Sequence, residues 1–107
     1  MNINNYPLKN IRILELTEVW AGPMGNSLMG DLGAEIIKIE SYPRAPITRP
    51  HDVISARRGL VENELSQERP WDGYASHNMA NRNKKGLSID LKTEMGKKTL
   101  FELVKCS

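Results

Sequence analysis

The sequence predicts an α/β fold in which helices flank a parallel β-sheet, and three observations favour it. Two short apolar runs, at 11–16 and 35–40, have the length and the β-branched content of strands in a covered parallel sheet. The residues between these runs repeat apolar side chains at the spacing of one helical face. A third segment, 87–91, alternates apolar and polar residues and precedes another helical pattern. Strands that alternate with helices in this way are typical of parallel sheets with right-handed crossovers.

The first unit is a strand, a helix and a second strand. A turn follows the run at 11–16 and leads to Pro23, a residue favoured at the first position of a helix. Gly33 is expected to end this helix in the left-handed conformation. We expect the buried face of the helix to consist of four apolar residues, Met24, Leu28, Met29 and Leu32.

The carboxyl edge of such a sheet is where ligands bind, because helix N-termini present free N–H groups there. Residues 17–26 and 40–44 belong to this edge, and a phosphate-bearing ligand is the first candidate. The spacing Gly22-x-x-Gly25 differs from the dinucleotide fingerprint G-x-G-x-x-G. The two glycines therefore also fit a structural role, in which they permit a tight turn and close packing of the helix.

The segment 41–80 has the composition of a long connection, since it holds four of the six prolines and few apolar runs. A structureless stretch of this length is uncommon inside a compact domain, so we expect a short helix near 54–65. The two histidines, His51 and His77, both fall in this connection. Histidine is the usual acid–base residue, but here we expect a surface position rather than a catalytic one.

The third strand is followed by a helix that Thr93 is expected to cap and that runs to about Lys105. Its apolar face consists of Leu100, Phe101, Leu103 and Val104. A sheet that stops after this helix leaves a strand edge and apolar helix surface uncovered. We therefore expect instability or self-association of the isolated chain.

Length and charge exclude several classes of function. The 107 residues allow one small domain. The net charge of +2, from 15 basic and 13 acidic residues, is not a nucleic-acid signature. A local basic cluster of Arg82, Lys84 and Lys85 could contact phosphates, but we expect a solvated loop there. The interleaved aromatic side chains of an RNA-binding module are missing around it.

The single cysteine, Cys106, excludes an internal disulfide, fits a reducing compartment and cannot support a metal cluster. The N-terminus lacks the cationic and apolar segments of a signal peptide, and no apolar run is long enough to span a membrane. We expect a cytoplasmic protein with no metal, no nucleic-acid partner and no membrane partner.

Two ordered motifs resemble those of a known enzyme family. The first is Ala21-Gly22-Pro23 together with the segment 30–40, GDLGAEIIKIE, and the second is the segment 81–92, NRNKKGLSIDLK. In this order they resemble the N-terminal part of the class III CoA-transferases of the CaiB/BaiF type. This family includes formyl-CoA transferase, carnitine CoA-transferase and α-methylacyl-CoA racemase. The resemblance extends from about Leu8 to Val104, apart from the variable stretch between the motifs.

The resemblance implies that residues 1–107 are the N-terminal, CoA-binding part of a longer enzyme with a Rossmann-like sheet and interlocked homodimers. Such an enzyme transfers CoA between carboxylic acids, with an acyl-CoA and a carboxylic acid as substrates. A carboxylate of the enzyme attacks the thioester. The family's catalytic aspartate lies past the end of this sequence, so no residue here is expected to be catalytic and the fragment is expected to be inactive. Racemase chemistry on an acyl-CoA is an alternative within the family.

The resemblance also implies a set of CoA-binding positions. Trp20 and Ala21 match the residues at the thioester end of CoA. Formyl-CoA transferases carry a glutamine at the position of Trp20, so the indole argues against small, polar acyl groups. Ser41 stands where the family often has an arginine that meets a CoA phosphate, and Arg44 could replace that arginine. The segment that lies along the adenosine part of CoA corresponds to Ile89, Asp90, Leu91 and Lys92.

A second hypothesis is a non-catalytic dinucleotide-binding or regulatory module. It would use Gly22, Gly25 and the strand-end Glu40, which follows Gly22 at a spacing close to the ~20 residues expected for a ribose-binding acid. The missing G-x-G-x-x-G fingerprint counts against it.

Overall fold

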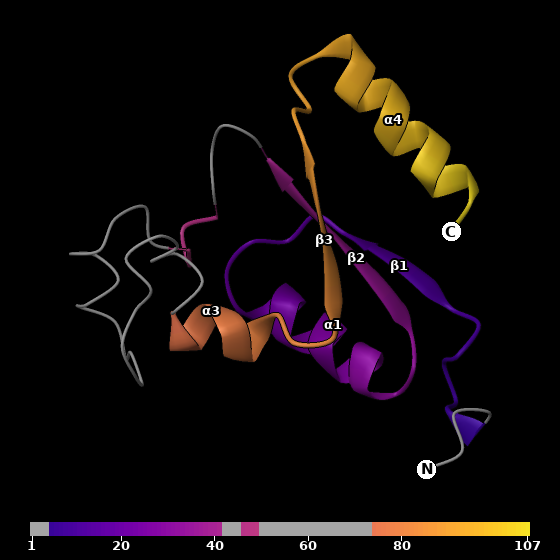
Figure 1. The fold of residues 1–107 in the computed structure, drawn as a ribbon, viewed down its shortest axis with the longest axis vertical. Helices are drawn as coiled ribbons and strands as arrows, with labels where there is room; N and C mark the ends of the chain where they lie inside the picture. Colours follow the sequence, from indigo (N-terminus) through magenta and orange to yellow (C-terminus); the bar gives the residue numbers. More distant parts are fainter. Residues whose placement is uncertain (1–4, 42–45, 50–73) are drawn as a thin grey trace.

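The computed structural model describes residues 5–41, 46–49 and 74–107, and within these ranges the chain forms a three-stranded parallel sheet with helices beside it (Figure 1). The elements in chain order are β1 (Arg12–Glu15), α1 (Ala21–Asp31), β2 (Glu35–Ser41), α3 (Ala75–Ala80), β3 (Lys84–Ile89) and α4 (Glu94–Lys105). The predicted α/β fold is confirmed. The helix expected near 54–65 lies outside the described residues.

The central strand of the sheet is β2, which pairs with β1 on one side and β3 on the other. Glu15, the last residue of β1, lies opposite Lys38, and Ser41 lies opposite Ile89 at the end of β3. Because β2 has neighbours on both sides, its isoleucines supply much of the core, with Ile36 1% and Ile39 7% exposed. At the carboxyl edge of the sheet, β2 continues for three residues past Lys38, the partner of the last residue of β1.

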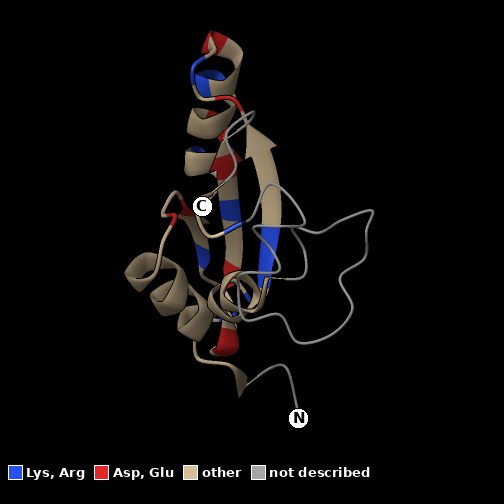
Figure 2. Ribbon diagram, turned by 90° about the vertical axis from the view of Figure 1, so that its left-hand side faces the viewer, with Lys and Arg blue, Asp and Glu red and all other residues tan. Residues whose placement is uncertain are grey.

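The helices lie on different faces of the sheet. The Lys84 side chain donates to carbonyls of α1 and α3 and pairs with Glu15, so both side chains point to the face that these helices cover. Arg12 points to the other face, where its Nη1 donates to the Cys106 carbonyl at the end of α4 over 2.8 Å. Figure 1 shows α4 well apart from α1 and α3, and Figure 2 shows both acidic and basic residues along it.

Helix α1 begins two residues earlier than expected. Its first residue is Ala21, so Pro23 occupies the third position, where a missing N–H group is still tolerated because the first turn has no intrahelical partners. The N-cap residue Trp20 makes no side-chain capping bond. At the other end, Gly33 has a φ of +100°, which confirms the left-handed stop. A Cβ there would also overlap the Tyr6 side chain.

The predicted buried face of α1 is wrong. Leu28, Met29 and Leu32 are 56%, 42% and 48% exposed, whereas Pro23 and Ser27 are the buried residues of this helix. The close approach of the helix to its neighbours explains the difference. A Cβ on Gly30 would lie only 3.2 Å from Asn83 Cβ and 3.4 Å from Ile36 Cγ1. Only small or compact residues fit on that side, so the long apolar side chains point outward.

The third strand begins three residues earlier than the alternation at 87–91 predicts, and it ends at Ile89. The Thr93 cap is confirmed, since its Oγ1 accepts a hydrogen bond from Gly96 N at 3.0 Å. On α4, Phe101 and Val104 are 64% and 54% exposed, so the uncovered apolar helix surface is also confirmed. Among the described helices, none has the length and hydropathy needed to cross a bilayer.

Candidate functional site

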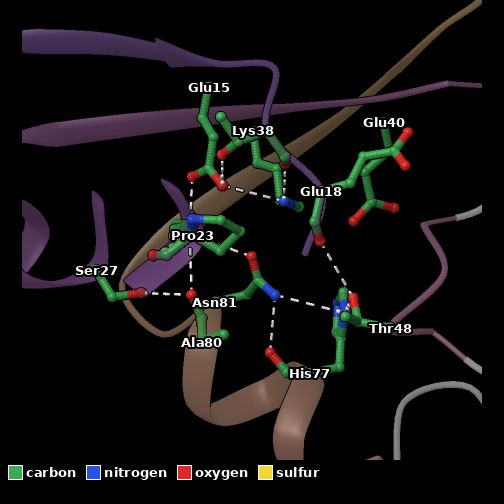
Figure 3. Close-up of polar contacts among 12 residues, drawn as sticks. Glu15, Glu18, Pro23, Ser27, Lys38, Glu40, Thr48, His77, Ala80 and Asn81 are labelled. Carbon is green, nitrogen blue, oxygen red and sulfur yellow. Dashed lines mark hydrogen bonds and ion pairs between the residues drawn. The ribbon is translucent and has the colours of Figure 1, made fainter. Parts of the chain in front are cut away.

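Three charged side chains meet beneath the turn that follows β1 (Figure 3). Lys38 Nζ lies 3.1 Å from Glu15 Oε1, and Lys84 Nζ lies 2.8 Å from Glu15 Oε2. All three side chains are at most 3% exposed. Buried lysines and glutamates are rare unless they are paired, so the ion pairs are what allows this Glu15–Lys38–Lys84 cluster to exist.

The strand geometry brings the cluster together. Glu15 and Lys38 are register partners on neighbouring strands, so their side chains project from the same face of the sheet. Lys84 starts β3 two residues before Gly86, the register partner of Lys38, and its long side chain reaches the same carboxylate. The three strands are thus joined by side chains as well as by main-chain hydrogen bonds.

Burial and pairing act in opposite directions on these groups. Burial alone would raise the pKa of Glu15, but the hydrogen bonds and charges of Lys84 and Lys38 outweigh it and hold that pKa below its ordinary value. Burial lowers the pKa of Lys84, and the Glu15 carboxylate opposes this effect. The carboxylate of Glu15 is therefore ionised at neutral pH.

The cluster also holds main-chain groups of the turn that leads into α1. Lys38 Nζ donates to the Thr17 carbonyl at 2.9 Å, and Lys84 Nζ donates to the Pro23 carbonyl at 2.8 Å. Thr17 Oγ1 donates to Glu15 Oε1 at 3.1 Å. The two lysines consequently bind carbonyl oxygens on either side of Trp20, one in the turn and one in the first turn of α1.

Helix α3 contributes the remaining partners of Lys84. Lys84 Nζ donates to the Ala80 carbonyl at 3.0 Å and to Asn81 Oδ1 at 3.1 Å. The Ala80 carbonyl also accepts a hydrogen bond from Ser27 Oγ of α1 at 2.7 Å. One carbonyl therefore links α1, α3 and β3.

His77 lies in the buried side of α3 and is only 2% exposed, so the expected surface position is wrong. Its Nδ1 is 3.0 Å from Thr48 Oγ1, and its carbonyl accepts from Asn81 Nδ2 at 2.8 Å (Figure 3). Burial, assisted by the positive charge of Arg49, lowers the pKa of His77 to about 4. The imidazole is therefore neutral at pH 7. His51 lies outside the described residues.

The residues predicted for the thioester end of CoA lie at the start of α1. Trp20 is the N-cap residue and is 46% exposed, and Ala21 is the exposed first residue of the helix. A Cβ on Gly22 would overlap the Thr17 side chain, so this glycine is required for the tight turn. A Cβ on Gly25 would meet nothing within 4 Å, so close packing does not require glycine there.

The residues predicted for the adenosine and phosphate parts lie at the ends of β2 and β3. Ser41 is half-buried and faces the buried Ile89 across the two strands. Leu91 is half-buried and the side chain of Lys92 is exposed. Arg44 lies outside the described residues. The register thus brings Ser41 and the start of the 89–92 segment side by side.

Asp90 shapes the turn between β3 and α4. Its Oδ1 accepts from Lys92 N at 3.0 Å, and its carbonyl accepts from Thr93 Oγ1 at 2.8 Å. This pattern, a side chain bonded to the main chain two residues on, is an Asx turn. A Cβ on Gly96 would overlap the Asp90 carbonyl, so the turn and the first turn of α4 are in close contact.

The basic cluster at 82–85 is only in part the solvated loop that its composition predicts, since the side chains of Arg82 and Lys85 are exposed but that of Lys84 is not. Lys84 is buried, Arg82 pairs with Asp31, and Lys85 Nζ lies 2.6 Å from Glu35 Oε1. The reason is that β3 begins at Lys84, and strand alternation sends Lys84 inward and Lys85 outward. Each of the three basic side chains therefore has an acidic partner.

The Glu15–Lys38–Lys84 cluster was not predicted from the sequence, although the sequence contains a signal for it. Glu15 and Lys38 are charged residues with an apolar neighbour on each side in two predicted strands. A charge at such a position is unfavourable unless another strand supplies its partner. Two opposite charges in two neighbouring predicted strands are therefore a usable sign of a buried ion pair.

Comparison with known proteins identifies the family. The sequence model of CoA-transferase family III matches residues 8–107. The chain belongs to this family. Human succinyl-CoA:glutarate CoA-transferase is 34% identical over 105 residues, which are 95% of this chain and 20% of that protein. Formyl-CoA:oxalate CoA-transferase of Streptomyces avermitilis is 33% identical over 100 residues, which are 94% of this chain and 21% of that protein.

A solved structure of another family III protein has the same fold. The CAIB/BAIF family protein from Brucella suis matches with a TM-score of 0.73 and 32% identity, over 94% of this chain and 24% of that protein. The chain spans about a fifth of the length of the curated relatives it matches. The fold is therefore the same α/β arrangement that forms part of a larger family III protein.

Proposed function

We propose that residues 1–107 are the N-terminal, CoA-binding part of an enzyme that transfers CoA between carboxylic acids. The observation that carries this proposal is the family III match over residues 8–107. The names of the relatives support the reaction class, since they describe transfer of CoA from succinyl-CoA to glutarate and from formyl-CoA to oxalate. The substrates are accordingly an acyl-CoA and a carboxylic acid.

The carboxyl edge of the sheet offers suitable groups for CoA. At the start of α1, the side chain of the N-cap residue Trp20 makes no capping bond to the first-turn N–H groups, and Trp20 and Ala21 are both exposed there. Uncapped N–H groups at a helix N-terminus favour negative charge, which suits the oxygen of a thioester as it is attacked. We place the thioester end of CoA at this point.

The adenosine and phosphate parts would lie along the neighbouring strand ends. The backbone and apolar surface of Ile89 to Leu91 would contact the adenosine, and the exposed Lys92 side chain would meet a phosphate. Ser41, opposite Ile89, offers a hydroxyl group, and Arg44 would supply a guanidinium. We assign these residues to binding and none of residues 1–107 to catalysis.

The acyl group is the part of the substrate that Trp20 would contact. An indole ring buries a large apolar area and can only donate a hydrogen bond, through its single N–H. We infer that the acyl group is larger and less polar than formyl or oxalyl. A racemase acting on the same class of acyl-CoA would use the same surface.

The proposal extends to the oligomeric state of the protein and to its cellular compartment. The exposed apolar side chains of α4, such as Phe101 and Val104, support association with more protein, and we propose a homodimer. A single cysteine in the chain supports a reducing compartment, such as the cytoplasm.

The dinucleotide-binding module has less support. Glu40, its ribose-binding acid, already pairs with Arg49, with Glu40 Oε1 3.2 Å from Arg49 Nη2 and both side chains largely buried. To bind a ribose, the Glu40 carboxylate would have to give up its ion pair with Arg49.

Calorimetric titration of the 107-residue chain with free CoA tests the proposal, with NAD as the competing ligand. Lys92→Ala should weaken CoA binding about fivefold, because it removes a charge-assisted hydrogen bond to phosphate. Lys98→Ala is the matched control, since Lys98 is an exposed lysine of α4 that is not assigned to the site. Binding of NAD without CoA would favour the dinucleotide module. An equal loss in both variants would mean that CoA is held only by general positive charge.

A further inference from the structure

We infer that Glu15, Lys38 and Lys84 are positioning residues, which hold the turn between β1 and α1 in the conformation that presents Trp20 and Ala21. The identity of the ligand in this inference rests on the proposed function. The turn comprises residues 16–20, and Figure 3 shows one of them, Glu18, close to Lys38.

The first argument is where the two lysines donate. Lys38 binds the carbonyl of Thr17, where the turn begins, and Lys84 binds the carbonyl of Pro23, in the first turn of α1. Each lysine also pairs with a different oxygen of Glu15. The carboxylate therefore fixes the distance between the two ammonium groups, and the ammonium groups hold Thr17 and Pro23 on either side of Trp20.

The second argument is that the Trp20 side chain has little support of its own. Trp20 is 46% exposed and makes no side-chain capping bond, so burial restrains its side chain only in part and no cap restrains it. Within the described residues, Thr48 Oγ1 contributes only a long contact of 3.4 Å to the Glu18 carbonyl. The Thr17 side chain packs against Gly22, which keeps the turn tight but leaves its tip exposed. The orientation of Trp20 consequently depends on its main chain.

The third argument concerns stability. A buried ion cluster is often no more stable than well-packed apolar residues of the same volume. This cluster also holds two positive charges for one negative charge, which makes it a poor choice for stability alone. Apolar side chains, however, cannot donate hydrogen bonds to the Thr17 and Pro23 carbonyls. The lysines thus supply hydrogen-bond donors to these two carbonyls, which a hydrophobic core could not supply.

The test uses Trp20 as a probe in a Trp71→Phe background, where Trp20 is the only remaining tryptophan of the two in the sequence. Lys38→Met should raise the acrylamide quenching constant of Trp20 about twofold and lower its fluorescence anisotropy, because the turn opens locally. The matched control is Lys85→Met, which removes a lysine that also pairs with a glutamate but projects from the other face. Lys85→Met should leave both signals unchanged.

A second variant separates positioning from stability. The triple change Glu15→Met, Lys38→Met and Lys84→Met removes every charge of the cluster and fills the same volume with apolar groups. We expect this variant to keep the urea midpoint of the parent chain and to show the raised quenching of Trp20. Quenching equal to that of the parent chain would overturn the inference, since the cluster would then act on stability alone.

The Trp20 measurement needs no ligand, so its outcome does not depend on the proposed function. A CoA titration of the same variants supplies the link between the two. If CoA binds the parent chain, Lys38→Met should weaken binding several-fold and Lys85→Met should not. If CoA contacts Trp20 in the parent chain, an unchanged CoA affinity in Lys38→Met would also overturn the inference.

Discussion

Lys84 and Glu15 belong to the two outer strands of the sheet, which do not pair with each other, yet Lys84 Nζ lies 2.8 Å from Glu15 Oε2. The long lysine side chain reaches across the face of the central strand to make this contact. Because the contact is buried, it joins β1 and β3 independently of the hydrogen bonds that each strand makes with β2.

Removal of the Lys84 charge should be costly. Lys84→Met should lower the free energy of unfolding by about 3 kcal/mol, because Glu15 stays buried with only one of its two cations. Lys85→Met should change that free energy by less than about 0.5 kcal/mol, since the Lys85 side chain is 73% exposed. Urea unfolding followed by circular dichroism measures both values, and similar losses in the two variants would contradict the burial of Lys84.

The buried His77 should make the chain less stable in mild acid. Its pKa is about 4 in the folded state and 6.5 ordinarily, so the unfolded state takes up a proton first as the pH falls. The stability that neutral His77 contributes is complete above pH 6.5 and is lost between pH 6.5 and 4. From pH 7 to 5 this loss amounts to about 2 kcal/mol.

The variant His77→Gln should remove this part of the pH dependence. Unfolding by urea at pH 7 and pH 5 measures it, and His51→Gln serves as the control that retains it. The range stops at pH 5 because the pKa of Glu15 is also lowered, so its ion pairs lose stability at more acidic pH. The same loss of stability in His77→Gln and in the parent chain would show that another group titrates.

Two glycines in helices should respond in opposite directions to alanine. Gly96→Ala should lower the free energy of unfolding by about 2 kcal/mol, because its Cβ would overlap the Asp90 carbonyl and lie 3.1 Å from Ile89 Cγ2. Gly25→Ala should raise it by about 0.5 to 1 kcal/mol, since the added methyl group meets nothing and alanine favours the helix. Thermal unfolding measures both changes. A neutral Gly96→Ala would contradict the close contact of α4 with the Asp90 carbonyl.

Two threonines of α4 allow a test of its cap. Thr93→Ala should cost about 1 kcal/mol, because Gly96 N loses its hydrogen-bond acceptor at the start of the helix. Thr99→Ala should change stability by no more than about 0.5 kcal/mol, since Thr99 Oγ1 donates to the Met95 carbonyl within the same helix. Equal effects of the two changes on urea unfolding would mean that the cap is not formed in solution.

Local signals in the sequence predicted the described elements except α3, which falls in the segment 41–80 expected to be a connection. Gly33 and Thr93 mark helix ends because their effects depend only on their own backbone and on the nearest residues. The apolar runs located β1 and β2, since strand periodicity is also local. The positions of these elements could therefore be read without knowledge of the tertiary structure.

Side-chain environments depended on contacts between distant segments and were predicted less well. The buried face of α1 follows from its close approach to Asn83 and Ile36, which helical periodicity cannot express. The burial of His77 and Lys84 follows from the docking of α3 on α1 and from the pairing of β3 with β2. The predicted CoA contacts of Trp20, Ala21, Ser41, Arg44 and residues 89–92 stay predictions.

The hydrogen bonds of the two buried lysines close chain loops of different lengths. This difference predicts an order in which the strands fold. The bond from Lys38 to Glu15 joins residues 23 positions apart, whereas the bond from Lys84 to Pro23 joins residues 61 positions apart. Closing the longer loop costs about 0.9 kcal/mol more in chain entropy, because this cost rises with the logarithm of loop length. We expect β1, α1 and β2 to form first and β3 to dock late, so that Lys84→Met mainly speeds unfolding and leaves the folding rate almost unchanged.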